Sequence, residues 1–398
     1  MKKVAGITLL LMWLLNPLNV LYAQTQTGAD EDWSKLARKV VEHVAGIQPA
    51  EAVMISGGQH VIPLMEALSI QTQHHGGFPS MLLSTDKVMR DYYSAVPMKY
   101  LMQDQRYLGE WLNHIDVWIN VSAVENYKTL MRDVPEARFA AIAKSEQSIA
   151  QMIDQSGIRL VNLPVPTQEM ADIHSIPLDR FKAIYRDAIE ADCQVIAKKG
   201  ALIKEMLHHA KDIHITTPQG TDFHLQCGER PVMIDDGMIS QAEVNAAEMR
   251  HRFVNLPGGK IFVAPLESTV NGRVYVPRML SSDSYECMEK ISFQLVNGVI
   301  RDFKAQKGIE IYEKRMAPYT GPKERFALLV IGLNPAMPVM REHDYLPLHA
   351  SGMVKISFGH NEIWGGENKT DAYFSFPLVG ATVKMDGKVV VNNGKLSI

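Results

Sequence analysis

The chain has 398 residues, of which 46% are apolar and 21% charged, and its formal net charge is −3 at pH 7. This length and composition are typical of an ordinary globular chain with room for two domains. A mildly acidic chain offers no electrostatic attraction to nucleic acid, so we predict no nucleic-acid partner.

The N-terminus predicts a secretory signal peptide over residues 1–23. The chain begins with Met1 and two lysines, an apolar run follows over residues 7–15, and Ala23 offers a small residue for cleavage. The run is shorter than the roughly 20 residues that cross a bilayer. We therefore expect an exported protein, periplasmic or extracellular, with no membrane contact after cleavage. The alternative is a short N-terminal anchor that is retained.

Strands of about five residues alternate with helices in the first half of the chain. A helix is expected over residues 33–44 and a single long one over Leu178–Met206, after which we place a domain boundary near residue 207. The alternation predicts an α/β domain over residues 24–207, built as an open, mostly parallel sheet with helices on both faces. The predicted strands are Glu51–Ser56, Phe78–Leu83, Val117–Val121 and Arg159–Leu163.

No cofactor signature follows these strands. Ligands of such sheets bind at the carboxyl ends of strands, here at Ser56-Gly57-Gly58 and Ser122, but neither segment forms a dinucleotide or phosphate loop. We therefore predict no cofactor. The pairs His74-His75 and His208-His209 are predicted to face solvent, because adjacent residues on a helix point in different directions.

The three cysteines are Cys193, Cys227 and Cys287. Their spacing matches no zinc knuckle, and an odd number permits at most one disulfide. We favour buried, small apolar side chains, and the sequence leaves their disulfide status open.

The second half, residues 208–398, reads as a strand-rich α+β domain with a mixed or antiparallel sheet. Two strands surround Pro218-Gln-Gly220, and turns at Asn297-Gly298 and Asp386-Gly387 are typical of hairpins. Helices are expected over residues 240–250 and 309–315.

One stretch, Asn255-Leu-Pro-Gly-Gly-Lys260, presents a polar side chain where a turn becomes a strand. Together with further motifs in order, it resembles the C-terminal domain of the aminopeptidase T family of metallo-aminopeptidases. The other motifs are Thr217-Pro-Gln-Gly-Thr-Asp222, Ala264-Pro265, Val270-Asn-Gly272, Ile331-Gly-Leu-Asn-Pro335, Ile356-Ser-Phe-Gly359, Gly365-Gly366 and Asn368.

The resemblance implies a dimeric exopeptidase with two divalent metals, commonly zinc or cobalt, held by two Glu, two His and one Asp. Such ions acidify a water and polarise the scissile carbonyl. The matching positions in this chain are Lys260, Leu328, Lys355, Tyr373 and Ser375. All five ligands are therefore absent.

These replacements predict that the metal centre does not form. A protonated lysine has no lone pair, and an ammonium about 4 Å from a divalent ion repels it by several kcal/mol at an effective dielectric constant near 20. We expect a metal-free pseudo-peptidase, a homodimer by resemblance, that binds a small anionic molecule or peptide at these five residues.

Three alternatives remain open. Two neighbouring lysines can depress each other's pKa, which would allow catalysis with Lys260 or Lys355 as nucleophile or base and Tyr373 and Ser375 assisting. A purely structural subunit would pair its lysines with acids such as Glu267 or Glu362. A displaced metal site could draw on Glu342, His343, Asp344, His349, His360 and Glu362.

Overall fold

A computed structural model describes residues 33–398 except 104–105, 133, 136–137, 282–284 and 344. The predicted signal peptide therefore lies outside the described residues. None of the helices in the described part is long and apolar enough to cross a membrane. Residues 33–398 form one compact unit that contains three sheets.

The first sheet is parallel throughout, as the alternating pattern predicted, and its strand order is β2-β1-β3-β4-β8. Its strands are β1 (Ala52–Gly58), β2 (Phe78–Ser84), β3 (Val117–Val121), β4 (Arg159–Leu163) and β8 (Phe253–Asn255). The edge strand β8 comes from the second half of the chain, beyond the boundary that we predicted near residue 207.

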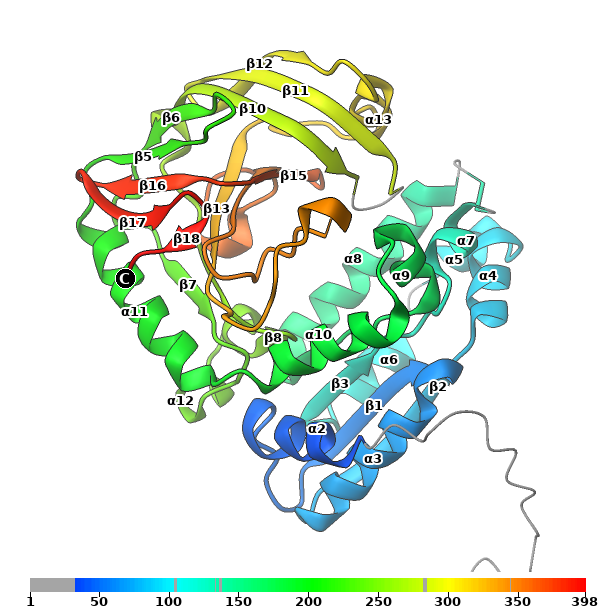
Figure 1. The fold of residues 1–398 in the computed structure, drawn as a ribbon. Helices are drawn as coiled ribbons and strands as arrows, with labels where there is room; N and C mark the ends of the chain where they lie inside the picture. The colour runs from blue at the N-terminus through cyan, green and yellow to red at the C-terminus, as the bar shows by residue number, and fades with distance from the viewer. Residues whose placement is uncertain (1–32, 104–105, 133, 136–137, 282–284, 344) are drawn as a thin grey trace, which may run out of the picture. The chain divides into compact units, whose positions relative to one another are not determined.

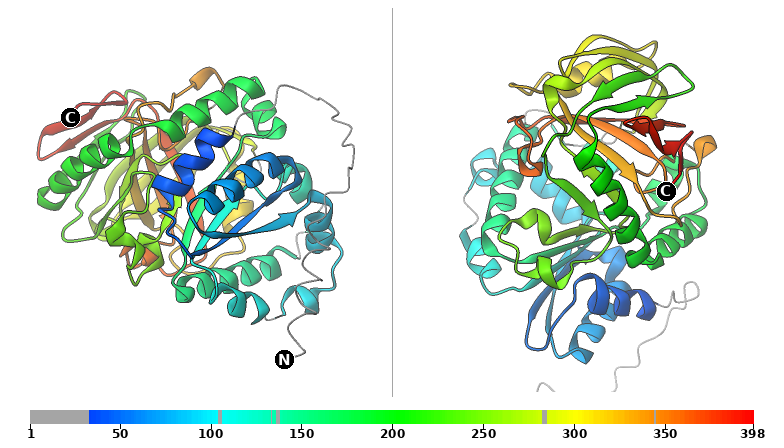
Figure 2. Two further views of the ribbon diagram at one scale, coloured as in Figure 1. Left: turned by 90° about the horizontal axis from the view of Figure 1, so that it is seen from below. Right: turned by 90° about the vertical axis from the view of Figure 1, so that its left-hand side faces the viewer.

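Helices cover both faces of this sheet (Figures 1 and 2). One face packs against α2 (Ser34–Lys39), the π-helical turn Val40–Val44 and α3 (Ile62–His74). The other packs against α6 (Arg106–Leu112) and α8 (Phe139–Ser156). The remaining helices of this half are α4 (Asp86–Ser94), α5 (Met98–Leu101), α7 (Tyr127–Arg132) and α9 (Gln168–His174).

The long helix expected over 178–206 is two helices, so that expectation was wrong. Helix α10 (Leu178–Glu190) ends at Ala191, and Asp192 begins α11 (Cys193–His209). The Asp192 carboxylate accepts a hydrogen bond from the Gln194 amide at 2.8 Å, which stabilises the new N-terminus. The expected helix over 240–250 is also reduced, to α12 (Gln241–Val244) and a short turn at Met249–His251.

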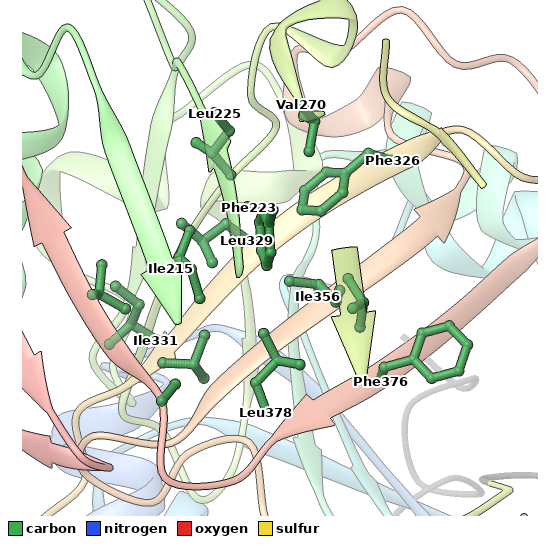
Figure 3. Packing of buried hydrophobic residues seen from close by; sticks show 14 of the residues in the cluster. Ile215, Phe223, Leu225, Val270, Phe326, Leu329, Ile331, Ile356, Phe376 and Leu378 are labelled. Carbon is green, nitrogen blue, oxygen red and sulfur yellow. The ribbon is translucent and has the colours of Figure 1, made fainter. Parts of the chain in front are cut away.

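The second half contains two antiparallel sheets that pack face to face. Their shared core is aromatic and aliphatic, and Figure 3 shows Phe223, Phe326 and Phe376 among its side chains. The larger sheet, sheet B, orders its strands β12-β11-β10-β6-β5-β16-β17-β18, and the smaller, sheet C, orders them β15-β14-β13-β9-β7. The strand-rich second half is thus confirmed, and so is the α/β class.

Each of the three predicted turns joins two paired strands of sheet B. Sheet B contains β5 (Ile213–Thr216), β6 (Asp222–Leu225), β10 (Asn271–Leu280), β11 (Cys287–Val296), β12 (Val299–Lys304), β16 (Thr382–Met385), β17 (Lys388–Asn392) and β18 (Lys395–Leu396). Sheet C contains β7 (Val232–Asp235), β9 (Lys260–Val263), β13 (Phe326–Gly332), β14 (Val354–Gly359) and β15 (Tyr373–Leu378), and α13 (Ile309–Met316) follows β12.

Candidate functional site

The turn before β9 holds position 260 rigidly. Gly259 has φ +115°, and a Cβ on it would lie 2.5 Å from the Cβ of Asn334, so only glycine fits there. The Asn334 side chain is fully buried and donates hydrogen bonds to the carbonyl oxygens of Gly258 and Ala188, each at 2.8 Å. Asn334 therefore fixes the turn against α10 and sets the start of β9.

Lys260 begins β9 and forms an ion pair with Asp235, directly opposite on β7. The Nζ–Oδ2 distance is 2.7 Å, and both side chains are largely buried. Lys260 Nζ also lies 3.3 Å from Nε2 of His349. The structural alternative paired Lys260 with Glu267 or Glu362. Its partner is instead Asp235, a residue that sequence reasoning did not single out.

Lys355 on β14 adds a second cation to this cluster. Burial, reinforced by the charge of Lys260, lowers the pKa of Lys355 from 10.5 to about 8. Among the described residues, no carboxylate lies within ion-pair distance of its Nζ. Burial and the two lysines also hold the pKa of His349 well below its usual value, so this imidazole is neutral and its Nε2 can accept a hydrogen bond from Lys260.

The other three predicted site residues lie on the same face of sheet C. Side chains alternate along strands, and the opposite face of β13, β14 and β15 contributes Leu329, Ile356 and Phe376 to the main core. Leu328 packs in a small apolar cluster with Phe262, beside Trp364.

Tyr373 and Ser375 stand on β15, opposite Gly359 and Ser357 of β14. Ser375 is therefore one diagonal step from Lys355, on the order of 7 Å away. Tyr373 is 43% exposed. The five residues share one surface, and the lysines are the two that interact electrostatically.

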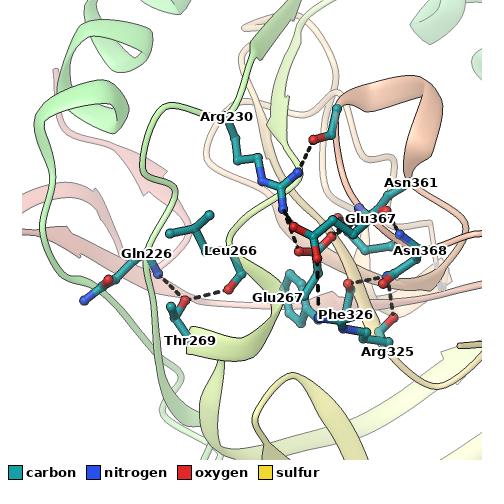
Figure 4. A network of polar contacts seen from close by, with 12 residues as sticks. Gln226, Arg230, Leu266, Glu267, Thr269, Arg325, Phe326, Asn361, Glu367 and Asn368 are labelled. Atoms are coloured by element: carbon teal, nitrogen blue, oxygen red, sulfur yellow. Dashed lines mark hydrogen bonds and ion pairs between the residues drawn. The ribbon is translucent and has the colours of Figure 1, made fainter.

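A buried polar network fixes the loop that follows β14 (Figure 4). Glu267 is 2% exposed and pairs with Arg230 at 3.0 Å, and it accepts a hydrogen bond from Asn361 Nδ2 at 2.9 Å. The side chain of Asn368 donates to the carbonyl oxygen of Phe326 at 2.8 Å, while the backbone amide of Asn368 donates to the side-chain oxygen of Asn361. Several motifs noted in the sequence are thus structural, since they hold this loop against sheet C.

Those residues considered for a displaced metal site that the structure describes do not gather. His349 contacts Lys260, Glu362 is exposed in the turn Glu362–Trp364, and Glu342 and His343 share the turn Arg341–His343. Asp344 lies outside the described residues. Within the described part of the chain, the metal-ligand types that come together are His214, Asp222 and His224 on sheet B, which sequence reasoning missed. The observed register of β5 and β6 places these residues on one face, and side-chain alternation in the two strands around Pro218-Gln-Gly220 is the signal that could have found them.

A surface hollow also lies on sheet B. It has a volume of about 410 Å³ and is lined mainly by residues of β10, β11 and β12, among them Arg273, Tyr275 and Lys304. It does not coincide with the lysine cluster of sheet C.

The cysteines form no disulfide: all three are free. Cys227 is fully buried, as expected, whereas Cys193 and Cys287 are partly exposed.

Comparison with known proteins settles the family. The family model described as thermophilic metalloprotease (M29) matches residues 29–323. The chain belongs to this family. The family predicted from the motifs is thereby confirmed, although β14 and β15, which carry Lys355, Tyr373 and Ser375, lie beyond the matched span.

Two solved structures share the fold of this M29 member. Wild-type AmpT from Thermus thermophilus superposes with a TM-score of 0.72 at 14% identity, over 92% of this chain and 99% of AmpT. The 2,5-dihydroxypyridine dioxygenase from Pseudomonas putida KT2440 superposes with a TM-score of 0.60 at 15% identity, over 93% of this chain and 98% of the dioxygenase.

A relative found by sequence similarity is also named as a dihydroxypyridine dioxygenase. The Pseudomonas putida 2,5-dihydroxypyridine 5,6-dioxygenase is 26% identical over 202 residues, which span 48% of this chain and 55% of the relative. The chain thus matches about half the length of this curated relative. Proteins with different activities share this fold, so the side chains of the site must decide the function.

The side chains present do not fit the di-metal centre that the family resemblance implies. Position 260 is an ammonium already paired with Asp235, position 355 is a second lysine, and position 328 is an apolar side chain packed in a cluster. None of these groups supplies a lone pair for a divalent ion at neutral pH, apart from the deprotonated fraction of Lys355.

Proposed function

We propose that this M29 family member is a metal-free pseudo-peptidase that binds a small anionic ligand, or the carboxylate end of a peptide, on the lysine face of sheet C. The observation that carries the proposal is the charge balance of the cluster. Lys260 and Asp235 neutralise each other, and His349 is neutral, so the ammonium of Lys355 is left without a counterion among the described residues. A carboxylate supplies that counterion.

Asp235 adds a second recognition element. Its Oδ2 accepts from Lys260, but its buried Oδ1 has no hydrogen-bond partner in the described structure. A buried acceptor without a partner costs about 1–3 kcal/mol, which a ligand donor would recover. The favoured ligand therefore carries both a carboxylate and an N–H or O–H donor, as free amino acids and short peptides do.

The first test is isothermal titration of the mature protein with acetate, inorganic phosphate, glycine and glycylglycine at pH 7. We expect glycine or glycylglycine to bind more tightly than acetate, and Lys355→Met to abolish detectable binding. The exposed Lys388 at the start of β17 provides the control, Lys388→Met, which should bind as wild type does. Equal affinities for wild type and Lys355→Met would overturn the proposal.

The second test is turnover of aminoacyl anilides with added zinc or cobalt. A pseudo-peptidase gives no turnover under any metal condition. Metal-dependent hydrolysis that survives extensive purification would refute the loss of peptidase activity, whatever the anion titrations show.

A second function is favoured by the lowered pKa of Lys355. With a pKa of about 8, a useful fraction of this amine is neutral at neutral pH and can attack a carbonyl carbon. Attack followed by loss of water yields an imine, which cyanoborohydride reduces to a stable secondary amine. Pyruvate with cyanoborohydride should then add mass to the peptide containing Lys355 and not to that containing Lys388. Equal labelling of both would argue against this chemistry.

We also propose that the chain is exported after cleavage behind Ala23 and acts as a homodimer. The basic start, the apolar run over 7–15 and the small residue at position 23 support export. N-terminal mass analysis of the secreted material and light scattering test the two statements separately.

A further inference from the structure

Three side chains with metal-binding atoms gather on the outer face of sheet B. His214 on β5 and His224 on β6 are directly opposite in the antiparallel pair, and their rings stack at a centroid distance of 4.0 Å with planes 6° apart. Asp222 lies two residues before His224, so it shares the same face. Ligand atoms of the three residues all lie within 4.8 Å of one another.

The strands hold this group outward. Ile213 and Ile215 flank His214 and are fully buried in the core shared with sheet C, as is Phe223 on β6. A slip of one residue would bury the histidines, so the core fixes their side of the sheet. The group therefore stands on a rigid surface that is separated from the lysine cluster by the core.

Hydrogen bonds already orient the ligand atoms. Nδ1 of His224 lies 2.7 Å from a carboxylate oxygen of Asp212, an arrangement that places the Nδ1 proton toward Asp212 and leaves Nε2 with a free lone pair. Nε2 of His214 lies 2.8 Å from Asp222.

We propose that His214, His224 and Asp222 bind a divalent transition-metal ion, with Zn²⁺ the best match, and that Asp212 orients His224. Two imidazole nitrogens and one carboxylate are a common zinc ligand set, which a water molecule completes to a tetrahedron. Zinc–ligand bonds of about 2.0–2.2 Å require neighbouring ligand atoms to be roughly 3.3 Å apart. The present ligand atoms lie within 4.8 Å of one another, so binding requires the partly exposed His214 and Asp222 and the exposed His224 to rotate toward the ion.

Two neighbouring cations compete with the ion. Arg273 lies 3.9 Å from Asp222, and Lys384 of β16 is directly opposite His214. The side chain of Arg273 is 63% exposed and Lys384 is also exposed, so both can turn into solvent when the ion binds. Their presence predicts that binding strengthens when Arg273 is replaced by Gln.

The test is titration of metal-stripped full-length protein with Zn²⁺, paired with the visible spectrum of the Co²⁺ form. We expect one ion per chain, a tetrahedral Co²⁺ spectrum, and at least about a 10-fold loss of affinity in His214→Ala and in His224→Ala. Asp212→Asn should weaken binding by roughly 10- to 100-fold, as loss of an orienting carboxylate does.

The matched control is His208→Ala with His209→Ala, since this pair stands at the end of α11 without joining the group. The control should bind zinc as wild type does. If His214→Ala and His224→Ala bind zinc as tightly as wild type does, the proposal is overturned. His214 and His224 lie on the outer face of sheet B, so the thermal unfolding curves of His214→Ala and His224→Ala without metal should match that of wild type.

Discussion

Lys355 is expected to lower the stability of the folded chain at neutral pH, and replacing it with Met should raise that stability. In the folded protein, burial and the nearby charge of Lys260 make protonation of Lys355 unfavourable, whereas the unfolded chain carries it as an ordinary lysine. Methionine has a similar length and no charge, so it removes this cost and keeps most of the packing.

The lowering of the Lys355 pKa from 10.5 to about 8 sets the size of the expected change in the free energy of unfolding. Each pKa unit corresponds to about 1.4 kcal/mol, so the cost is about 3 kcal/mol when both states are protonated. The sign follows from proton binding: between pH 8 and pH 10.5 the unfolded chain binds more protons than the folded chain, so wild-type stability rises with pH relative to the variant. Below pH 8 the cost is present in full, and above pH 10.5 it disappears.

The assay is urea unfolding of wild type, Lys355→Met and the control Lys388→Met at several pH values from 7 to 10.5. The expected advantage of Lys355→Met is largest at pH 7 and declines steadily above pH 8. A variant that is no more stable than wild type at pH 7, or an advantage that does not change with pH, would refute the electrostatic reasoning. The control should follow wild type throughout.

Three further predictions concern the frame around the site. Arg230→Met leaves the buried carboxylate of Glu267 without its ion pair and should cost about 3–5 kcal/mol in urea unfolding; a loss below about 1 kcal/mol would contradict it. Gly258→Ala places a Cβ 2.2 Å from the Cα of Gly237, so we expect a loss of about 3 kcal/mol or more and a lower melting temperature, and a wild-type melting curve would disprove the clash. Burial raises the pKa of the Cys227 thiol to about 12, so a thiol reagent at pH 8 should modify this residue only after unfolding, and rapid native labelling would count against that burial.

Local patterns were sufficient to predict most of the strands. The hairpin through Asn297 and Gly298 formed as expected, because both residues adopt the positive φ values that a tight turn requires. The break between α10 and α11 was missed, since Asp192 reads as one polar position among others in an amphipathic sequence. The role of β8 was missed because three residues give too short a pattern, and its pairing with β4 depends on contacts far along the chain.

The candidate site was predictable in part. Matching motifs located Lys260 and Lys355, whereas the common face of all five residues follows from the observed register of sheet C. Asp235 and His349 were not predictable in the same way: one lies on a strand that the sequence did not mark, and the other reaches Lys260 from a loop 89 residues away. Long-range pairing of this kind leaves no local trace in a sequence.

The three-residue strand β8 has a consequence for how the chain can be divided. It closes the parallel sheet at Asn255, and only the segment Leu256–Gly259 separates it from Lys260 at the start of β9. The backbone therefore passes from one sheet to the next within a single tight turn, and this segment links the two halves directly. A fragment ending near residue 207 would lack β8, the edge strand of the parallel sheet. Any displacement of Lys260 on ligand binding would be transmitted through this turn to β8.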